Sequence, residues 1–114
     1  MRSMPEATKR ARDEFRLEHI YCMSCGALAS DVHEICRGPH RARAVTERCT
    51  WLLLCRRCHD DMDGYAEWPI EKQLGCKLVH DPNWFDLDRV NEIRGRAPGA
   101  ITLADIVPYL EVKE

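Results

Sequence analysis

The sequence lacks a membrane-spanning segment, a secretory signal and a strong net charge, three features that would assign a protein to a broad class. Its 114 residues contain no apolar run long enough to span a bilayer. Residues 1–15 lack the apolar segment of a secretory signal. The formal net charge is only −2, so the chain as a whole is not a polycation that would coat nucleic acid. We therefore expect a cytoplasmic protein in a reducing environment, with no membrane partner.

Aromatic residues are also scarce, at 7% of the chain, and no repeat or low-complexity segment occurs. A chain of this length forms one domain with a modest apolar core, which leaves a need for some stabilising element besides packing. We divide it into an N-terminal helix over residues 5–17, a core over residues 18–67 and a helical extension over residues 68–114. Short strands expected at residues 31–36 and 50–54 place the protein in the α+β class.

Capping residues divide the C-terminal extension into separate helices. One helix is expected to begin near Ile70, and another begins at Asp81, which precedes a proline, and continues through Ile93. Thr102 caps a last short helix that reaches Leu110. We interpret these helices as packing elements, with a partner-docking surface as the alternative.

Seven cysteines are present, an odd number that cannot pair completely within one chain. Four of them form two pairs with the spacing Cys-x-x-Cys, namely Cys22 with Cys25 and Cys55 with Cys58. Two such pairs are the usual source of four thiolates for a tetrahedral structural zinc, which pins together the ends of the intervening segment. Redox pairs or unrelated free thiols are the alternatives. The remaining three are expected to be small buried side chains: Cys36, Cys49 and Cys76.

Histidines accompany both cysteine pairs. His33 lies on the strand expected after the first pair, and His59 follows Cys58 directly. Asp63 is four residues beyond His59, so the two share a helix face. Two imidazoles and a carboxylate suit a divalent cation with open coordination positions. Each residue also has an ordinary explanation: a strand histidine, an acid near a helix N-terminus or, for His59, a substitute zinc ligand.

The order of these motifs resembles the HNH endonuclease family. The resemblance rests on the first cysteine pair, on Val32-His33-Glu34-Ile35 and on Leu52-Leu53-Leu54-Cys55-x-x-Cys58-His59. It covers residues 21–63 and is greatest with small phage-encoded or phage-derived members, some of which also have glutamate after the first histidine. It implies a ββα-metal core, in which a β-hairpin and a helix hold one catalytic cation, and a bacterial or phage-infected host cytoplasm.

The resemblance also implies the ligands of that cation. His33 and His59 correspond to metal ligands, and Asp63 corresponds to a further ligand one helical turn on. The cation would be Mg²⁺, Mn²⁺, Ni²⁺ or Zn²⁺, distinct from the structural zinc. Charge that develops on the scissile phosphate and its leaving oxygen would be stabilised by this cation, while a general base activates water.

Two positions depart from the usual pattern of the family. Glu34 stands where the family usually has a histidine as general base, and it is either the base or another metal ligand. Glutamate is a weaker base than histidine. Thr50 stands where the family usually has an asparagine that orients the base. His40 in the following loop is an alternative base.

Arginines gather between the first histidine motif and the second cysteine pair. Residues 37–58 contain six arginines and a single acid, Glu47. Because a guanidinium offers phosphate a planar fork of donors, we expect contacts with the DNA backbone that have little sequence preference. A solvated loop is the alternative. The six are Arg37, Arg41, Arg43, Arg48, Arg56 and Arg57.

Two other functions fit parts of the pattern. A non-catalytic zinc module that binds DNA or protein would explain the departures at Glu34 and Thr50. A non-haem iron oxygenase also uses two histidines and a carboxylate, although the neighbouring cysteine pairs do not favour it. For the nuclease, the resemblance to phage proteins implies DNA processing or packaging, with a phage terminase as a partner.

Overall fold

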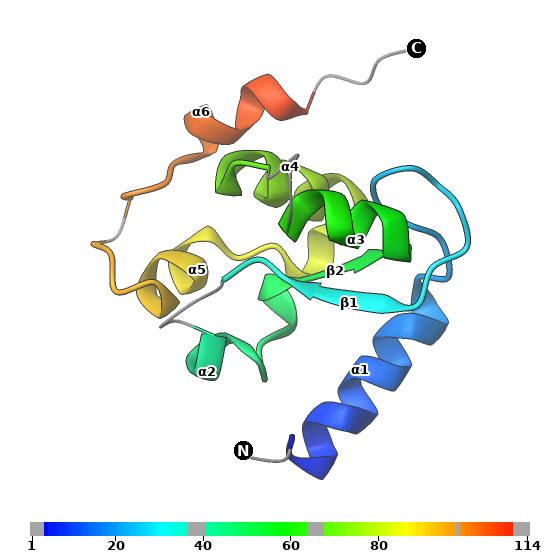
Figure 1. The fold of residues 1–114 in the computed structure, drawn as a ribbon. Helices are drawn as coiled ribbons and strands as arrows, with labels where there is room; N and C mark the ends of the chain where they lie inside the picture. Colours follow the sequence, from blue (N-terminus) through cyan, green and yellow to red (C-terminus); the bar gives the residue numbers. More distant parts are fainter. Residues whose placement is uncertain (1–3, 37–40, 64–67, 98, 111–114) are drawn as a thin grey trace.

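The computed structural model describes residues 4–36, 41–63, 68–97 and 99–110, without the side chains of Arg41, Met62 and Asp63. Two short strands lie near the middle of the chain, and helices precede and follow them, as the α+β class predicts (Figure 1). The elements in chain order, with η for a 3-10 helix, are α1 (Glu6–Glu18), β1 (Asp31–Glu34), α2 (Arg41–Ala44), η2 (Arg48–Thr50), β2 (Trp51–Leu54), α3 (Arg56–Asp63), α4 (Ile70–His80), η3 (Pro82–Trp84), α5 (Leu87–Ile93), α6 (Leu103–Ile106) and η4 (Val107–Tyr109).

The strands β1 and β2 form a two-stranded antiparallel sheet, in which Glu34 faces Trp51. All four residues of β2 are fully buried, as its compact apolar run predicts. β1 is shorter than the strand expected over residues 31–36 and ends at Glu34. The N–H of Ile35 still donates to the carbonyl of Thr50 at 2.7 Å, so the pairing continues one residue beyond the regular strand.

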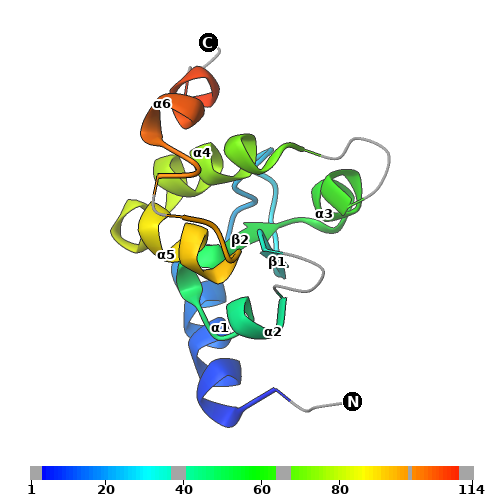
Figure 2. The same cartoon turned by 90° about the vertical axis from the view of Figure 1, so that its left-hand side faces the viewer.

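Helices pack against the sheet from opposite sides. α1 lies below the sheet and α4 above it in both views (Figures 1 and 2). Phe15 of α1 is fully buried and packs edge-on against Trp51, with ring centroids 5.7 Å apart. Leu74 of α4 belongs to the same cluster of buried side chains, which extends to Ile106 of α6. The apolar core is therefore continuous from the N-terminal helix into the C-terminal extension.

The extension is helical as predicted, but its second helix is divided. The helix expected from Asp81 onward is instead η3 followed by α5. The division arises because Asp86 caps a new helix, its carboxylate accepting from the N–H of Arg89 at 3.0 Å. The cap at Thr102 is confirmed and forms a capping box with Asp105.

The segment between the strands contains more helix than the sequence predicted. α2 and η2 each form a single turn in a stretch expected to be mostly a loop, and η2 includes Thr50, which was expected to start the second strand. None of the helices in the described ranges combines the length and apolar character needed to cross a bilayer.

A buried lysine joins α4 to the sheet. Lys77 is fully buried, and its ammonium donates to the carbonyls of Arg48 and Trp51, both at 2.8 Å, and to the Asp81 carboxylate at 2.7 Å. Three donors therefore meet three acceptors. Burial lowers the pKa of Lys77. Burial acts to raise the pKa of Asp81, but hydrogen bonds from Lys77 and Arg48 outweigh it and lower that pKa overall.

Replacing Lys77 by methionine should lower the free energy of unfolding by about 3 kcal/mol, because two carbonyls lose the ammonium as a donor and the buried Asp81 carboxylate loses one of its cationic partners. Urea denaturation of the full chain measures the change. Lys72→Met on the same helix is the matched control, because the Lys72 ammonium lies only over the ring of Trp68, at 3.9 Å. It should cost less than about 1 kcal/mol. Equal losses in the two variants would contradict an anchoring role for Lys77.

Candidate metal centre

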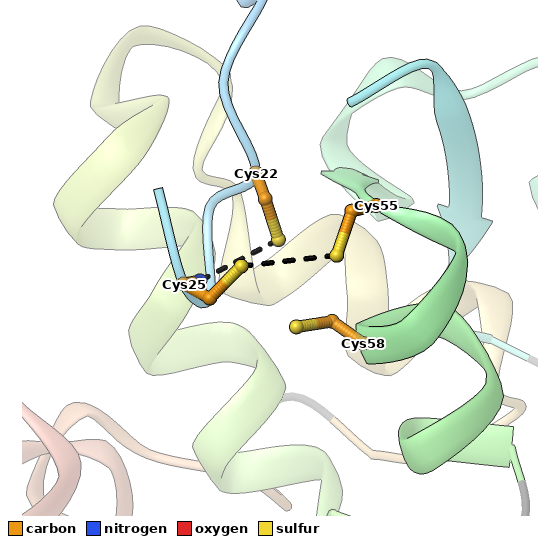
Figure 3. Close-up of side chains that lie close together, drawn as sticks. All are labelled: Cys22, Cys25, Cys55 and Cys58. Atoms are coloured by element: carbon orange, nitrogen blue, oxygen red, sulfur yellow. Dashed lines mark hydrogen bonds between the residues drawn. The ribbon is translucent and has the colours of Figure 1, made fainter. Parts of the chain in front are cut away.

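The four cysteines of the two pairs converge at one point (Figure 3). Cys22 and Cys25 come from a turn before β1, and Cys55 and Cys58 from the junction of β2 with α3. All four sulfurs lie within 4.8 Å of one another, and those of Cys25 and Cys55 are 3.7 Å apart. Sulfurs bound to a tetrahedral zinc at about 2.3 Å are about 3.8 Å from each other, so the separation of Cys25 and Cys55 matches such a site and the cluster could hold the ion. Among the described side chains, it is the one group of three or more cysteines, histidines or acids that could hold a metal.

The first cysteine pair is held by a tight turn. The N–H of Gly26 donates to the carbonyl of Cys22 at 2.9 Å, and Gly26 has a φ of 82°, which favours glycine over other residues. The N–H of Met23, between the two cysteines, donates to the carbonyl of Leu53 at 2.9 Å. The turn is therefore hydrogen-bonded to β2, the strand that is followed directly by Cys55 of the second pair.

The surroundings of the sulfurs affect the individual thiols differently. Burial acts to raise the pKa of the free Cys22 thiol, but backbone N–H groups, including those of Ser24 and Cys25 at 3.4 and 3.5 Å, outweigh it and lower that pKa to about 7. Burial raises the pKa of the free Cys58 thiol to about 12. Because zinc binds thiolates, its binding must release protons, and its affinity should fall in acid.

The other three cysteines lie outside the cluster. Cys36 and Cys49 are buried, as predicted, and burial raises the pKa of each thiol to about 11. Cys76 is half-buried, less than predicted, and its thiol donates to the carbonyl of Met23 at 3.2 Å. Burial raises its pKa to about 12. We interpret all three as inert thiols that fill space.

His33 in β1 and His59 in α3 lie side by side. Their ring centroids are 5.2 Å apart, and their planes meet at 81°. His33 is buried, and the His59 side chain is 22% exposed. His59 is one residue beyond Cys58, so the cysteine cluster also fixes the start of α3 against β1. Asp63 ends α3, and its side chain lies outside the described part of the structure.

Each of the two imidazoles has an oxygen acceptor at one ring nitrogen. Nδ1 of His59 is 3.2 Å from Oδ2 of Asp31, and Nε2 of His33 is 2.8 Å from Oε1 of Gln73. Such outer contacts accompany metal-binding histidines and fix their orientation. Sequence reasoning missed both partners. Asp31 carries a usable signal, because residues two apart on a strand share a face, whereas Gln73 is 40 residues from His33 and carries none.

Glu34 contacts a different helix from the one that His33 contacts. Its Oε1 accepts from the guanidinium of Arg12 on α1 at 3.1 Å, and the two side chains are 8% and 9% exposed. The same guanidinium lies 5.0 Å from the ring centroid of Trp51. Neighbouring residues of a strand face opposite sides, so His33 faces α3 and α4 while Glu34 faces α1. Glu34 therefore belongs to a buried ion pair with the N-terminal helix.

Thr50 occupies the position that the resemblance assigns to an asparagine. It is fully buried, and its hydroxyl lies 2.7 Å from the carbonyl of Glu47 and 3.0 Å from that of Ala44. A hydroxyl has a single proton, so these carbonyls take up its donor capacity. Thr50 therefore stabilises the turn that leads into β2.

The arginines singled out in the sequence do not share one environment. Arg48 is held inside the molecule: its side chain is 11% exposed, and it donates to Glu18 at 2.7 Å and to Asp81 at 3.2 Å. Its guanidinium also lies 5.0 Å from the ring centroid of Phe15 and 4.8 Å from that of Trp84. These contacts give Arg48 a structural role.

Three other arginines are exposed: Arg43, Arg56 and Arg57. The Arg56 side chain is 74% exposed and also forms an ion pair with Asp31 at 3.2 Å. Arg37, His40 and the side chain of Arg41 lie outside the described residues.

Comparison with known proteins found no match among protein-family models, curated proteins or solved structures. The features of the chain that bear on function are the cysteine cluster and the paired histidines.

Replacing Cys55 by serine should remove bound zinc and loosen the fold, because zinc binding to such a cluster supplies roughly 10–16 kcal/mol of apparent folding free energy. Elemental analysis and circular dichroism measure the two effects. Cys76→Ser is the matched control, because Cys76 is a neighbouring thiol outside the cluster. The control should retain one zinc per chain. Retention of zinc and fold by Cys55→Ser would refute the assignment.

Proposed function

We propose that this chain is a metal-dependent DNA endonuclease of the HNH type, with a ββα-metal core stabilised by zinc. The observation that carries the proposal is the pair of histidines, His33 from β1 and His59 from α3. Their rings are adjacent, and each has one nitrogen held by an oxygen acceptor. A zinc module that only binds a partner has no need of a second pair of oriented imidazoles.

In this proposal, His33 and His59 hold a catalytic cation, with Asp63 as a third ligand one helical turn from His59. Two imidazoles and a carboxylate suit Mg²⁺, Mn²⁺, Ni²⁺ or Zn²⁺ with open positions. When bound, the cation stabilises negative charge on the scissile phosphate and its leaving oxygen. The cysteine cluster holds β1 and α3 together, so the two imidazoles are in place before any cation binds.

The contact with Arg12 guides the role that we propose for Glu34. A ligand of the same cation should lie on the strand face of His33, and Glu34 lies on the other face. A general base for water at this cation would have to reach the same face, so the buried pair with Arg12 argues against Glu34 in that role as well. We therefore take His40, the alternative base, as the candidate, and assign Glu34 to the contact with α1.

DNA is proposed to bind through arginines of residues 37–58, the segment that lies between the two histidine motifs and includes the second cysteine pair. Arg48 is left out of this surface, because its guanidinium, only 11% exposed, is engaged by the carboxylates of Glu18 and Asp81. Contacts from guanidinium to phosphate position the duplex with little sequence preference and weaken as salt increases. The proposed surface consists of Arg37, Arg41, Arg43, Arg56 and Arg57.

A non-catalytic zinc adaptor is the second candidate function. The observations that favour it are the buried pair between Glu34 and Arg12 and the use of the Thr50 hydroxyl in a turn. Both occur at positions where the resemblance would place catalytic groups. The adaptor binds one zinc per chain, whereas the nuclease binds a second, exchangeable cation. Metal analysis after dialysis against each divalent ion therefore separates the two functions.

Substituting His33 or His59 by alanine should reduce metal-dependent cleavage of plasmid DNA by at least about 100-fold, because each change removes a ligand worth several kcal/mol of charge stabilisation. Cleavage is assayed with Mg²⁺, Mn²⁺, Ni²⁺ and Zn²⁺, with a chelator as the blank. His80→Ala is the matched control, an exposed histidine at the end of α4. It should cleave like the unmodified chain.

Melting and zinc content of the same variants are measured in parallel. His33→Ala and His59→Ala should keep the structural zinc, because four cysteines already complete that site. Loss of zinc from His59→Ala would place His59 in the zinc site and contradict the division into two centres. DNA binding by the unmodified chain without cleavage in any divalent metal would favour the adaptor.

Replacing Arg43 and Arg57 together by alanine should weaken binding to every duplex tested. The slope of log affinity against log salt should flatten by about 2, since each phosphate contact contributes about 0.9. Fluorescence anisotropy over a salt series measures both quantities. The matched control replaces Arg10 and Arg96, which are also exposed but lie elsewhere in the chain. A loss confined to one DNA sequence would identify base contacts instead.

A further inference from the structure

Gln73 of α4 contacts the proposed centre from a segment to which the sequence assigned only packing. Its side chain is buried, and both ends of its amide are engaged. Oε1 lies 2.8 Å from Nε2 of His33, and Nε2 of Gln73 lies 2.9 Å from the carbonyl oxygen of Trp68. A buried amide with two such contacts has one defined orientation.

The contact with Trp68 determines which way the amide points. A carbonyl oxygen can only accept, so the Gln73 atom facing Trp68 is the NH₂ group. The amide oxygen then faces His33, and Nε2 of His33 must carry the hydrogen in that contact. A neutral imidazole has one N–H, so the lone pair of His33 is on Nδ1.

The same reasoning applied to His59 gives the opposite tautomer. Its Nδ1 faces a carboxylate oxygen of Asp31 at 3.2 Å, and an ionised carboxylate only accepts. Nδ1 of His59 therefore carries the hydrogen, and its lone pair is on Nε2. The two acceptors thus select Nδ1 on one ring and Nε2 on the other as the nitrogens that can bind a cation.

We propose that Gln73 is a positioning residue of this centre, which fixes the tautomer and ring orientation of His33 so that Nδ1 is presented to the cation. The inference rests on the proposed function for its cation, but the tautomer of His33 does not. Gln73 itself is not a ligand, because its oxygen and its nitrogen are both used within the protein. Its helix, α4, thereby becomes part of the metal centre.

The chemistry of an amide suits this place. A neutral amide accepts from His33 and donates to Trp68 without adding a charge to a buried site. An apolar side chain would leave the N–H of His33 without this acceptor and would release the ring to its other tautomer. A carboxylate would restore the acceptor but lose the donor to Trp68. Gln73→Leu therefore removes the oxygen that accepts from His33, whereas Gln73→Glu keeps an accepting oxygen and removes only the amide N–H group.

The test uses the full chain with its zinc, at about pH 8, where imidazoles are ordinarily neutral. A long-range ¹H–¹⁵N spectrum of the histidine rings reports which nitrogen of His33 carries hydrogen. We expect Nε2–H in the unmodified chain, a mixture of tautomers in Gln73→Leu, and recovery of Nε2–H in Gln73→Glu. Leu74→Val is the matched control, a buried change on the same helix that should leave the spectrum of His33 unaltered.

The same samples are titrated with Mn²⁺ alone, followed by calorimetry. Affinity should fall by roughly 10–100-fold in Gln73→Leu, recover at least in part in Gln73→Glu, and change less than about 3-fold in Leu74→Val. Hydrogen on Nδ1 of His33 in the unmodified chain, or unchanged Mn²⁺ affinity in Gln73→Leu, would overturn the proposal. Nε2–H on His33 with no Mn²⁺ binding to any sample would instead overturn the proposed function, and leave Gln73 fixing a histidine without a cation.

Discussion

The meeting of four cysteine sulfurs is the constraint on which the rest of this structure depends. The two strands have four residues each and α3 has eight, lengths that are marginal without tertiary support. A metal ion such as zinc, when bound at this cluster, would join the turn before β1 to the start of α3. Its contribution, roughly 10–16 kcal/mol, would be comparable to the net stability of a typical domain. The distance between His33 and His59 is therefore set by the cluster as much as by packing.

Buried polar contacts from one face of α4 complete the arrangement. Gln73 and Lys77 are four residues apart and so share a helix face. Gln73 reaches His33 in β1, and Lys77 reaches the carbonyl of Trp51 in β2. The C-terminal extension is thus hydrogen-bonded to both strands of the core. Because each of these groups is buried, moving α4 would leave unsatisfied donors and acceptors on both elements, which resists such a displacement.

Features that depend on residues close together in the chain could be predicted from the sequence, and contacts between distant segments could not. The cysteine cluster, the buried strand β2 and the cap at Thr102 depend on spacing or on a local run of residues, and all three were predicted. The break before α5 was missed, because the pattern of apolar residues continues through it while Asp86 starts a new helix. The partners of His33 and Glu34 come from α4 and α1, far away in the chain, and no periodicity connects them.

The difference between neighbours in the sequence and neighbours in space also applies to the adjacent residues His33 and Glu34. Strand geometry sends them to opposite faces, so their adjacency in the sequence does not place them at one site. Removing a charged pair from water is costly, and apolar replacements of such pairs are often equally stable. Stability alone therefore gives little reason for a buried pair of Arg12 and Glu34. The histidine face of β1 alone therefore supports the proposed metal centre, whereas the pair of Arg12 and Glu34 joins α1 to the opposite face.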